Sequence, residues 1–305
     1  MKLSRTRIAV ACGVLVLIGF GCRTPPPTAP IGIGTRLPID DARADRVLRD
    51  HLADVRNRVA LRGSARVRLE GPDFKLDRPQ RILVERPARL RFEVIGLFDQ
   101  LAALLATDGT QYGFYDAESG RVSRGRVTPS LLRDLAHIDL GIPEVVGLLL
   151  GAPHPSEGLS RAGVWQVPGG RIALGFARPR GPTDPECRTA PERRWLDPTC
   201  FASPAALARG GELFIFGREG RLVELRRLEP DGALRFRARF ENHHSLGGAD
   251  PGNEFPYRLT ILFPEAASSV RFDWKRVMLA ERIPDRFFAI PEKSASDPVG
   301  SSRDG

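Results

Sequence analysis

Apolar and polar residues alternate along much of the chain, in short runs that are separated by turn residues. The first run has apolar residues at every second position, at Ala65, Val67 and Leu69, and similar runs follow as far as Leu105. Alternation of this kind is typical of strands with one buried face. Turn signals such as EGPD, ERPA and TDGT separate the runs by only a few residues. The pattern therefore predicts an antiparallel meander with one apolar face.

A helical period replaces the alternation at two places. The segment 41–60 predicts one amphipathic helix, because its apolar residues recur at spacings of four, three and four: Leu48, Leu52, Val55 and Val59. The segments 129–136 and 143–150 predict two short helices, each opened by a proline. The second of these is apolar nearly all round, which predicts that it is buried in, or lies as a lid over, a cavity of the sheet.

Strand signals resume after residue 160 and bring the total to about a dozen. The expected fold is mainly β with α: a single strongly curved antiparallel sheet, or half-open β-barrel, with an N-terminal helix and an inserted helical lid. This domain is expected over residues 41–293 and includes a cysteine-containing insertion at 178–210. Residues 294–305 are expected to form a disordered tail.

The N-terminus has the composition of an export signal. Three basic residues, Lys2, Arg5 and Arg7, precede an apolar run over 8–20. This run is shorter than the ~20 apolar residues that a membrane-spanning helix needs, so a membrane anchor is the disfavoured alternative. Basic residues, a short apolar core and small residues at its end predict a cleaved signal peptide at 1–21.

The end of this signal, IGFGC, resembles a bacterial lipobox, whose cysteine is acylated and becomes the new N-terminus. The resemblance implies that Cys22 carries acyl chains such as palmitate. Arg23 follows, and the lack of an Asp there implies an outer-membrane lipoprotein that faces the periplasm. Residues 22–40 are rich in proline and glycine, which predicts an extended tether between the lipid and the domain.

The remaining cysteines agree with export. Cys12 lies in the signal, which leaves Cys187 and Cys200 as the pair of the mature chain, both in the proline-rich insertion. In an oxidising compartment this pair predicts a disulfide bond that closes the insertion. Two cysteines without clustered histidines supply too few ligands for a metal, so no metal site is expected.

The chain has 305 residues, 42% of them hydrophobic, and a net charge of +9. A basic balance can indicate nucleic-acid binding. Here, however, the arginines alternate with apolar residues, as in ARVRLE and LRFRARFE, which places them on the solvated face of strands. The sequence also lacks the Gly-x-Ser-x-Gly, phosphate-loop and His-Glu-x-x-His motifs. We therefore expect a protein that is not an enzyme, uses no cofactor and binds no nucleic acid.

One predicted hairpin has an unusual tip. In the segment FEVIGLFDQLAALLATDG, Leu97 and Phe98 lie between Gly96 and Asp99, where polar turn residues are usual. The framing residues predict a genuine turn with an apolar tip that contacts a membrane or a lipid. The alternative is that the tip folds back and both side chains pack in the core.

The order of these features resembles the LolA/LolB-like lipoprotein-localisation family, and is closest to its outer-membrane receptor branch, LolB. The resemblance rests on the helix, the meander with FEVIGLFDQLAALLATDGTQYGFYD, the helical pair, the later strands and the closing WKRVMLAERIPDRFFAIP, and covers most of residues 45–291. It implies an apolar cavity that holds the acyl chains of lipoproteins, and a membrane-insertion turn at Leu97 and Phe98.

For the acyl cavity we expect inward-facing residues of the meander and of the second short helix, with the small Ala103 leaving room beside them: Leu90, Phe92, Val94, Leu105, Tyr112, Phe114, Leu148 and Leu149. The expected partners are the acyl chains of other lipoproteins, a periplasmic LolA-like carrier, and the inner leaflet of the outer membrane through the Cys22 lipid. Residues of this kind also form the filled core of an ordinary sheet.

Two functions from different classes follow. In the first, the protein accepts the acyl chains of lipoproteins and helps to insert them into the outer membrane, without covalent catalysis. In the second, an envelope lipoprotein uses the same scaffold as a non-transporting interaction module of an envelope assembly machine.

Overall fold

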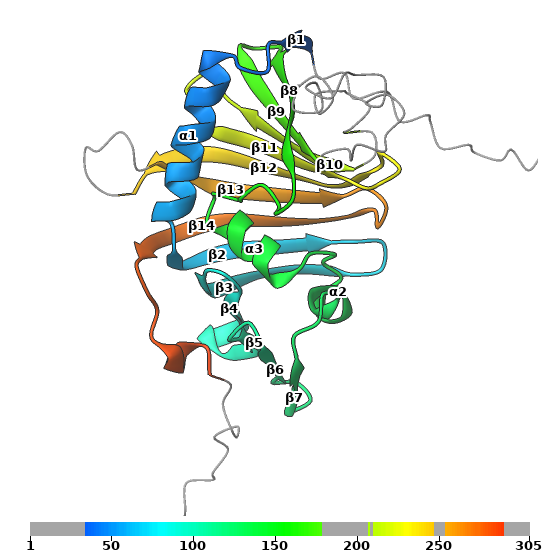
Figure 1. The fold of residues 1–305 in the computed structure, drawn as a ribbon. Helices are drawn as coiled ribbons and strands as arrows, with labels where there is room; N and C mark the ends of the chain where they lie inside the picture. The colour runs from blue at the N-terminus through cyan, green and yellow to red at the C-terminus, as the bar shows by residue number, and fades with distance from the viewer. Residues whose placement is uncertain (1–33, 179–206, 208–209, 247–253, 290–305) are drawn as a thin grey trace, which may run out of the picture. The chain divides into compact units, whose positions relative to one another are not determined.

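Fourteen strands form one antiparallel sheet in the computed structural model, which describes residues 34–178, 207, 210–246 and 254–289. Their order across the sheet is β1-β8-β9-β10-β11-β12-β13-β14-β2-β3-β4-β5-β6-β7 (Figure 1). Two meanders, β2 to β7 and β8 to β14, each pair neighbours in sequence. They meet where β14 pairs with β2, so that residues near the two ends of the domain lie side by side in the middle of the sheet.

The strands of the first meander follow a short edge strand and the N-terminal helix: β1 Thr35–Leu37, α1 Ala42–Asn57, β2 Ala60–Glu70, β3 Lys75–Glu85, β4 Arg89–Ile95, β5 Leu101–Thr107, β6 Gln111–Asp116 and β7 Arg121–Arg126. Two helices and the second meander come next: α2 Leu131–Ala136, α3 Ile142–Leu149, β8 Ser160–Val167, β9 Arg171–Ala177, β10 Gly211–Phe216, β11 Leu222–Leu228, β12 Leu234–Ser245, β13 Glu254–Phe263 and β14 Ser268–Ala280. Short 3-10 turns lie at Leu97–Asp99 and Asp285–Phe287.

The predicted antiparallel sheet with an N-terminal helix is confirmed, but the strongly curved half-barrel is not. The sheet is open: β1 and β7 stand at opposite ends of the strand order, and each pairs with one neighbour. Helices α1 and α3 pack on one face of the sheet (Figure 1). Because the helices bury the apolar face, the sheet does not have to curl on itself to do so. The sheet also begins earlier than expected, since β1 lies within the predicted tether.

Helix α1 covers the half of the sheet that contains β8 to β10. The carboxylate of Asp41 caps it by accepting hydrogen bonds from the backbone N–H groups of Arg43 and Ala44. Its buried residues are Ala44, Val47, His51 and Val55. Of the predicted apolar face, Val55 is buried, while Leu48, Leu52 and Val59 are half-buried. The buried face differs from the predicted one because its centre is His51, a polar residue that a pattern of apolar residues does not include.

Helix α3 fills the middle of the same face. All of its isoleucine, valine and leucine side chains are buried, and it packs against β3 and β4. Its first turn is closed by the Glu144 side chain, which accepts from the backbone N–H of Gly141 at 3.0 Å. The predicted apolar helix is therefore part of the core rather than a cover over open space. Helix α2 stands apart from it, near the first meander (Figure 1).

The buried His51 gives a prediction about stability. Its ring donates from Nε2 to the Pro153 carbonyl at 2.8 Å and lies against Phe214 and Phe216. Burial, with a smaller contribution from the Arg58 charge, lowers the pKa of His51 to about 4. The unfolded chain therefore takes up this proton first as the pH falls below 6.5, and up to about 3 kcal/mol of stability is lost by the time the pH reaches 4.

We expect the melting temperature to fall between pH 7 and pH 4.5, and to fall less in a His51→Gln variant, whose amide keeps a donor for Pro153 but does not titrate. Thermal unfolding followed by circular dichroism at both pH values measures the difference. An equal fall in melting temperature in the two proteins would contradict the presence of a neutral buried histidine.

Candidate functional site

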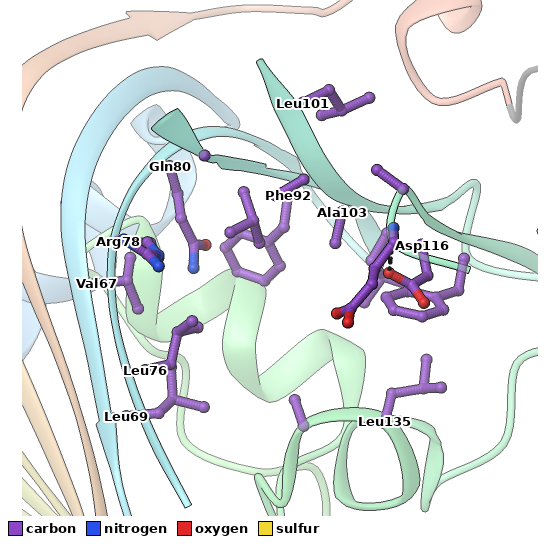
Figure 2. A pocket seen from close by; sticks show the side chains of 18 of the residues that line it. Val67, Leu69, Leu76, Arg78, Gln80, Phe92, Leu101, Ala103, Asp116 and Leu135 are labelled. Carbon is purple, nitrogen blue, oxygen red and sulfur yellow. Dashed lines mark hydrogen bonds between the residues drawn. The ribbon is translucent and has the colours of Figure 1, made fainter. Parts of the chain in front are cut away.

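An open apolar cavity of about 960 Å³ lies over the first meander. Strands β2 to β6 and β14 supply its floor, and α2 forms one wall. Figure 2 shows side chains from these elements converging on the space between the strands and the helix. The volume falls in the range of ~300–1,000 Å³ that is common for small-molecule sites.

Strand alternation explains why these side chains meet. Residues i and i+2 of a strand point to the same face, so Phe92 and Val94 of β4 share the cavity face with Ala103 and Leu105 of β5. In the register of the two strands, Val94 lies opposite Ala103 and Phe92 opposite Leu105. The small side chain of Ala103 leaves the space above it empty, because no bulky neighbour replaces the missing volume.

The structure brings together half of the residues that were expected to line the cavity. Phe92, Val94, Leu105 and Phe114 line it together with Ala103. The other four lie outside the lining: Leu90, Leu148 and Leu149 are buried in the core, and Tyr112 packs against that core from the side. Leu148 and Leu149 border only a void of about 10 Å³ beneath α3.

Other lining residues were not anticipated from the sequence. Leu135 and Ala136 come from α2, and Val270 and Phe272 come from β14. The strand β14 is distant in sequence and reaches the cavity through its pairing with β2. The helix contributes because it stands opposite the strands, which alternation within one segment does not reveal.

The apolar turn between β4 and β5 borders this cavity and projects from the sheet. Leu97 is 71% exposed and Phe98 is 91% exposed, and both line the cavity mouth. The turn is closed by the Gly96 N–H, which donates to the Gln100 carbonyl at 2.8 Å. The arrangement excludes the alternative in which the tip folds back into the core. Exposed large side chains of this kind mark sites of contact with a partner or a membrane.

The backbone of the turn is held in an unusual conformation. Phe98 has φ 57° and Asp99 has φ 60°, in the left-handed region that glycine adopts most readily. Arg81 fixes the turn by donating to both carboxylate oxygens of Asp99, at 3.1 and 2.9 Å. An exposed phenylalanine with a left-handed backbone conformation does not stabilise the fold. A side chain that is kept at such a position points to a role in binding.

A Phe98→Gly substitution is expected to leave the domain as stable as before or more stable, by up to about 1 kcal/mol, because a left-handed non-glycine residue costs ~1–2 kcal/mol and glycine's chain entropy offsets part of the gain. The midpoint of chemical denaturation measures this. A clear loss of stability would mean that the ring packs against the domain.

Among the residues that the structure describes, no group of three or more His, Cys, Asp and Glu side chains could hold a metal ion. The predicted lipidation site Cys22 and the predicted disulfide Cys187–Cys200 lie outside the described residues. Within the described ranges, no helix has both the length and the apolar character needed to cross a membrane.

Comparisons with known proteins bear on the fold. No protein-family model matches the sequence, and no curated protein matches it. The structure is similar to a domain described as an outer membrane lipoprotein-sorting protein from Vibrio parahaemolyticus, with a TM-score of 0.50 over 80% of this chain and 94% of that domain, at 10% identity. At this identity the likeness shows a shared fold. The resemblance found in the sequence is thus confirmed for the fold of lipoprotein-sorting domains.

Two further structures give slightly lower scores. A LolA superfamily protein from Nitrosomonas europaea has a TM-score of 0.49 and 12% identity, and the match covers 81% of this chain and 97% of that one. A DUF1329 family protein from Desulfovibrio piger has a TM-score of 0.49 and 11% identity, with 81% and 96% covered.

Proposed function

We propose that this protein is an outer-membrane lipoprotein that binds the acyl chains of other lipoproteins in the cavity over the first meander and helps to insert them into the membrane. The observation that carries the proposal is the juxtaposition of an open apolar cavity of about 960 Å³ with the exposed apolar tip at Leu97 and Phe98. A cavity alone fits many ligands. A cavity with an exposed apolar turn at its mouth fits a ligand that enters from a membrane or leaves into one.

The energetics of acyl chains suit such a site. Each buried methylene contributes about 0.8 kcal/mol, so ten methylenes contribute about 8 kcal/mol before the costs of binding. Apolar contact of this size offsets the cost of association without any covalent step, and longer chains gain more. It also allows release, because the same methylenes lose nothing when they move from the cavity into a bilayer.

The predicted N-terminal features complete the arrangement. A lipid on Cys22 would anchor the protein, and the proline-rich residues 22–34, which precede β1, would let the domain reach the bilayer surface. The tip would then contact the same leaflet into which the chains are released. The likeness of the fold to lipoprotein-sorting domains supports this reading of the cavity.

The test uses the full chain with Cys22→Ala and a fluorescent fatty-acyl probe. We expect saturable binding and displacement of the probe by a triacylated lipoprotein peptide. If the probe does not bind, the cavity does not accept acyl chains, and an interaction module of an envelope assembly machine becomes the better account of the protein.

A further inference from the structure

Two polar residues interrupt the apolar face of β3. Ile82 and Val84 of this strand are fully buried on the cavity side of the sheet, and Leu76 lies on the same face. Between them, at the alternate positions that should also be apolar, stand Arg78 and Gln80, and both line the cavity. A departure from the pattern inside a binding site is expected where the residues serve a ligand rather than the fold.

Neither side chain has a partner within the described part of the chain. The Arg78 guanidinium and the Gln80 amide form no hydrogen bond or ion pair with any described residue. Gln80 is only 6% exposed, whereas Arg78 is exposed at the side of the cavity. Within the described residues, the fully buried polar side-chain atoms that lack a partner belong to Arg62 and Ser268, so the Gln80 amide still faces the open space of the cavity. Figure 2 shows both side chains at the cavity wall formed by β3, near Phe92.

The opposite face of the sheet shows the contrast. There Arg66 donates to Asp77 at 2.6 Å, and Arg68 bonds both Asp77 and Asp273. These two arginines of the solvated face are thus paired with neighbouring carboxylates. Arg78, on the cavity face of the same strand as Asp77, is exposed and forms no ion pair with a described carboxylate, so its donors are available to a ligand.

The two acidic residues of the cavity lining, Asp116 and Glu118, form no ion pair with Arg78 in the described part of the chain. Asp116 lies on β6, three strands away and therefore about 14 Å across the sheet. Its carboxylate accepts from the Ser119 hydroxyl at 2.6 Å and from the Glu118 backbone N–H at 3.2 Å. The hydrogen bond from Ser119, more than any other contact, holds the pKa of Asp116 below its usual value. Asp116 is therefore an ionised residue engaged in its own turn.

We propose that Arg78 and Gln80 form a head-group subsite, which holds the oxyanion of an amphiphile whose acyl chain occupies the cavity. This inference rests on the acyl cavity of the proposed function and goes beyond it to a further class of ligand: a free amphiphile whose chain ends in a carboxylate or a phosphate, whereas the acyl chains of a lipoprotein end in neutral ester and amide groups. The planar guanidinium donates two parallel hydrogen bonds to such a group, and the Gln80 amide donates a third. The ligand supplies the acceptors that both side chains lack.

The position of the subsite agrees with entry from the membrane. Gln80 lies opposite Val94 in the pairing of β3 with β4. The pairing ends there, and Arg78 lies two residues further along β3, towards the end of β4 from which Gly96 opens the exposed turn; Arg78 and Gly96 both line the cavity. The head group would therefore lie at the side of the cavity next to the tip, while the chain extends over β4 and β5 towards α2.

The test compares matched ligands on the full chain carrying Cys22→Ala. The neutral fluorophore N-phenyl-1-naphthylamine reports occupancy, and dodecyl phosphate, dodecanoate and dodecanol compete with it. We expect both anions to bind roughly tenfold more tightly than dodecanol. Arg78→Gln and Gln80→Leu should each reduce this preference to less than about threefold, with dodecanol affinity unchanged.

Arg66→Gln is the control, because it removes one arginine charge from the adjacent strand on the opposite face. It should keep the preference for anions. Equal binding of the three ligands, or an equal loss in Arg66→Gln, would overturn the subsite and leave the acyl cavity standing. Failure of all three to displace the fluorophore would overturn both proposals. Displacement by inorganic phosphate alone would also overturn the subsite, because it would show an anion site that needs no chain.

Discussion

Ala103→Trp is expected to reduce the affinity for a fatty-acyl probe by more than tenfold while the domain stays folded. Ala103 lies on the cavity floor between Val94 of β4 and Asp116 of β6 (Figure 2). An indole at this position occupies the space that the chain would use, and displacing it would cost about 1–3 kcal/mol in repacking. The ring enters empty space rather than a packed core, so the domain itself is not overfilled. Probe titration measures the affinity, and thermal unfolding checks the fold.

The matched control is Val122→Trp on the neighbouring edge strand β7. Val122 is exposed, and it pairs with Tyr115, on the face opposite to the cavity. The same side chain added there should leave probe binding unchanged. If the two variants bind the probe equally well, acyl chains do not occupy the cavity. If the Ala103→Trp variant does not fold, Ala103→Leu fills less of the cavity and should also lower the affinity for the probe.

The double substitution Leu97→Glu and Phe98→Glu is expected to lower binding to vesicles by at least a hundredfold. Burial of the two side chains in the bilayer interface contributes about 1.5–3 kcal/mol each, and two carboxylates add an unfavourable charge near anionic lipid. Both residues are exposed, and their turn is held by Arg81 and Asp99, so the fold should be unaffected. Flotation with vesicles of phosphatidylethanolamine and phosphatidylglycerol, using the Cys22→Ala chain, measures the loss.

The control for this experiment is Met278→Glu on β14. Met278 is 55% exposed, so it tests whether any exposed apolar side chain promotes vesicle binding. It should bind vesicles as the parent does. An unchanged affinity in the double variant would refute membrane contact by the tip. A lipoprotein-delivery assay with both variants would then connect vesicle binding with function, because delivery should fail only in the double variant.

The sequence predicts the strands and the exposed tip because both depend on local information. Alternation fixes which residues of β4 and β5 share a face, and Gly96 and Asp99 mark the turn whatever the rest of the chain does. Phe92, Val94 and Leu105 could for this reason be placed in the cavity from the sequence. Their position depends only on the strand in which they lie.

The remaining differences come from contacts between distant segments. Alternation predicts that Leu90 lies on the apolar face of the sheet. Whether a side chain on this face lies in the packed core or lines the cavity depends on the position of α3. The same holds for Leu148 and Leu149 of α3, which pack in the core instead of lining the cavity. Curvature depends on what covers the sheet, and the helices α1 and α3 do so without closure. Arg78 and Gln80 could not be predicted as cavity residues, because polar residues at inward positions of a strand only weaken the alternating pattern. Their place in the cavity follows from the tertiary structure.

The pairing of β14 with β2 also affects how the protein folds. Each meander consists of contacts between neighbours in sequence, which form quickly. The seam between the meanders joins Ala60–Glu70 to Ser268–Ala280, across nearly the whole domain, so it closes only when the C-terminal strand has emerged. Until then β2 and β13 are long unpaired edges, of the kind that recruit other chains. If the chain is exported from its N-terminus, as the sequence predicts, it would present an aggregation-prone intermediate until β14 emerges, and a chaperone that covers strand edges would act during that interval.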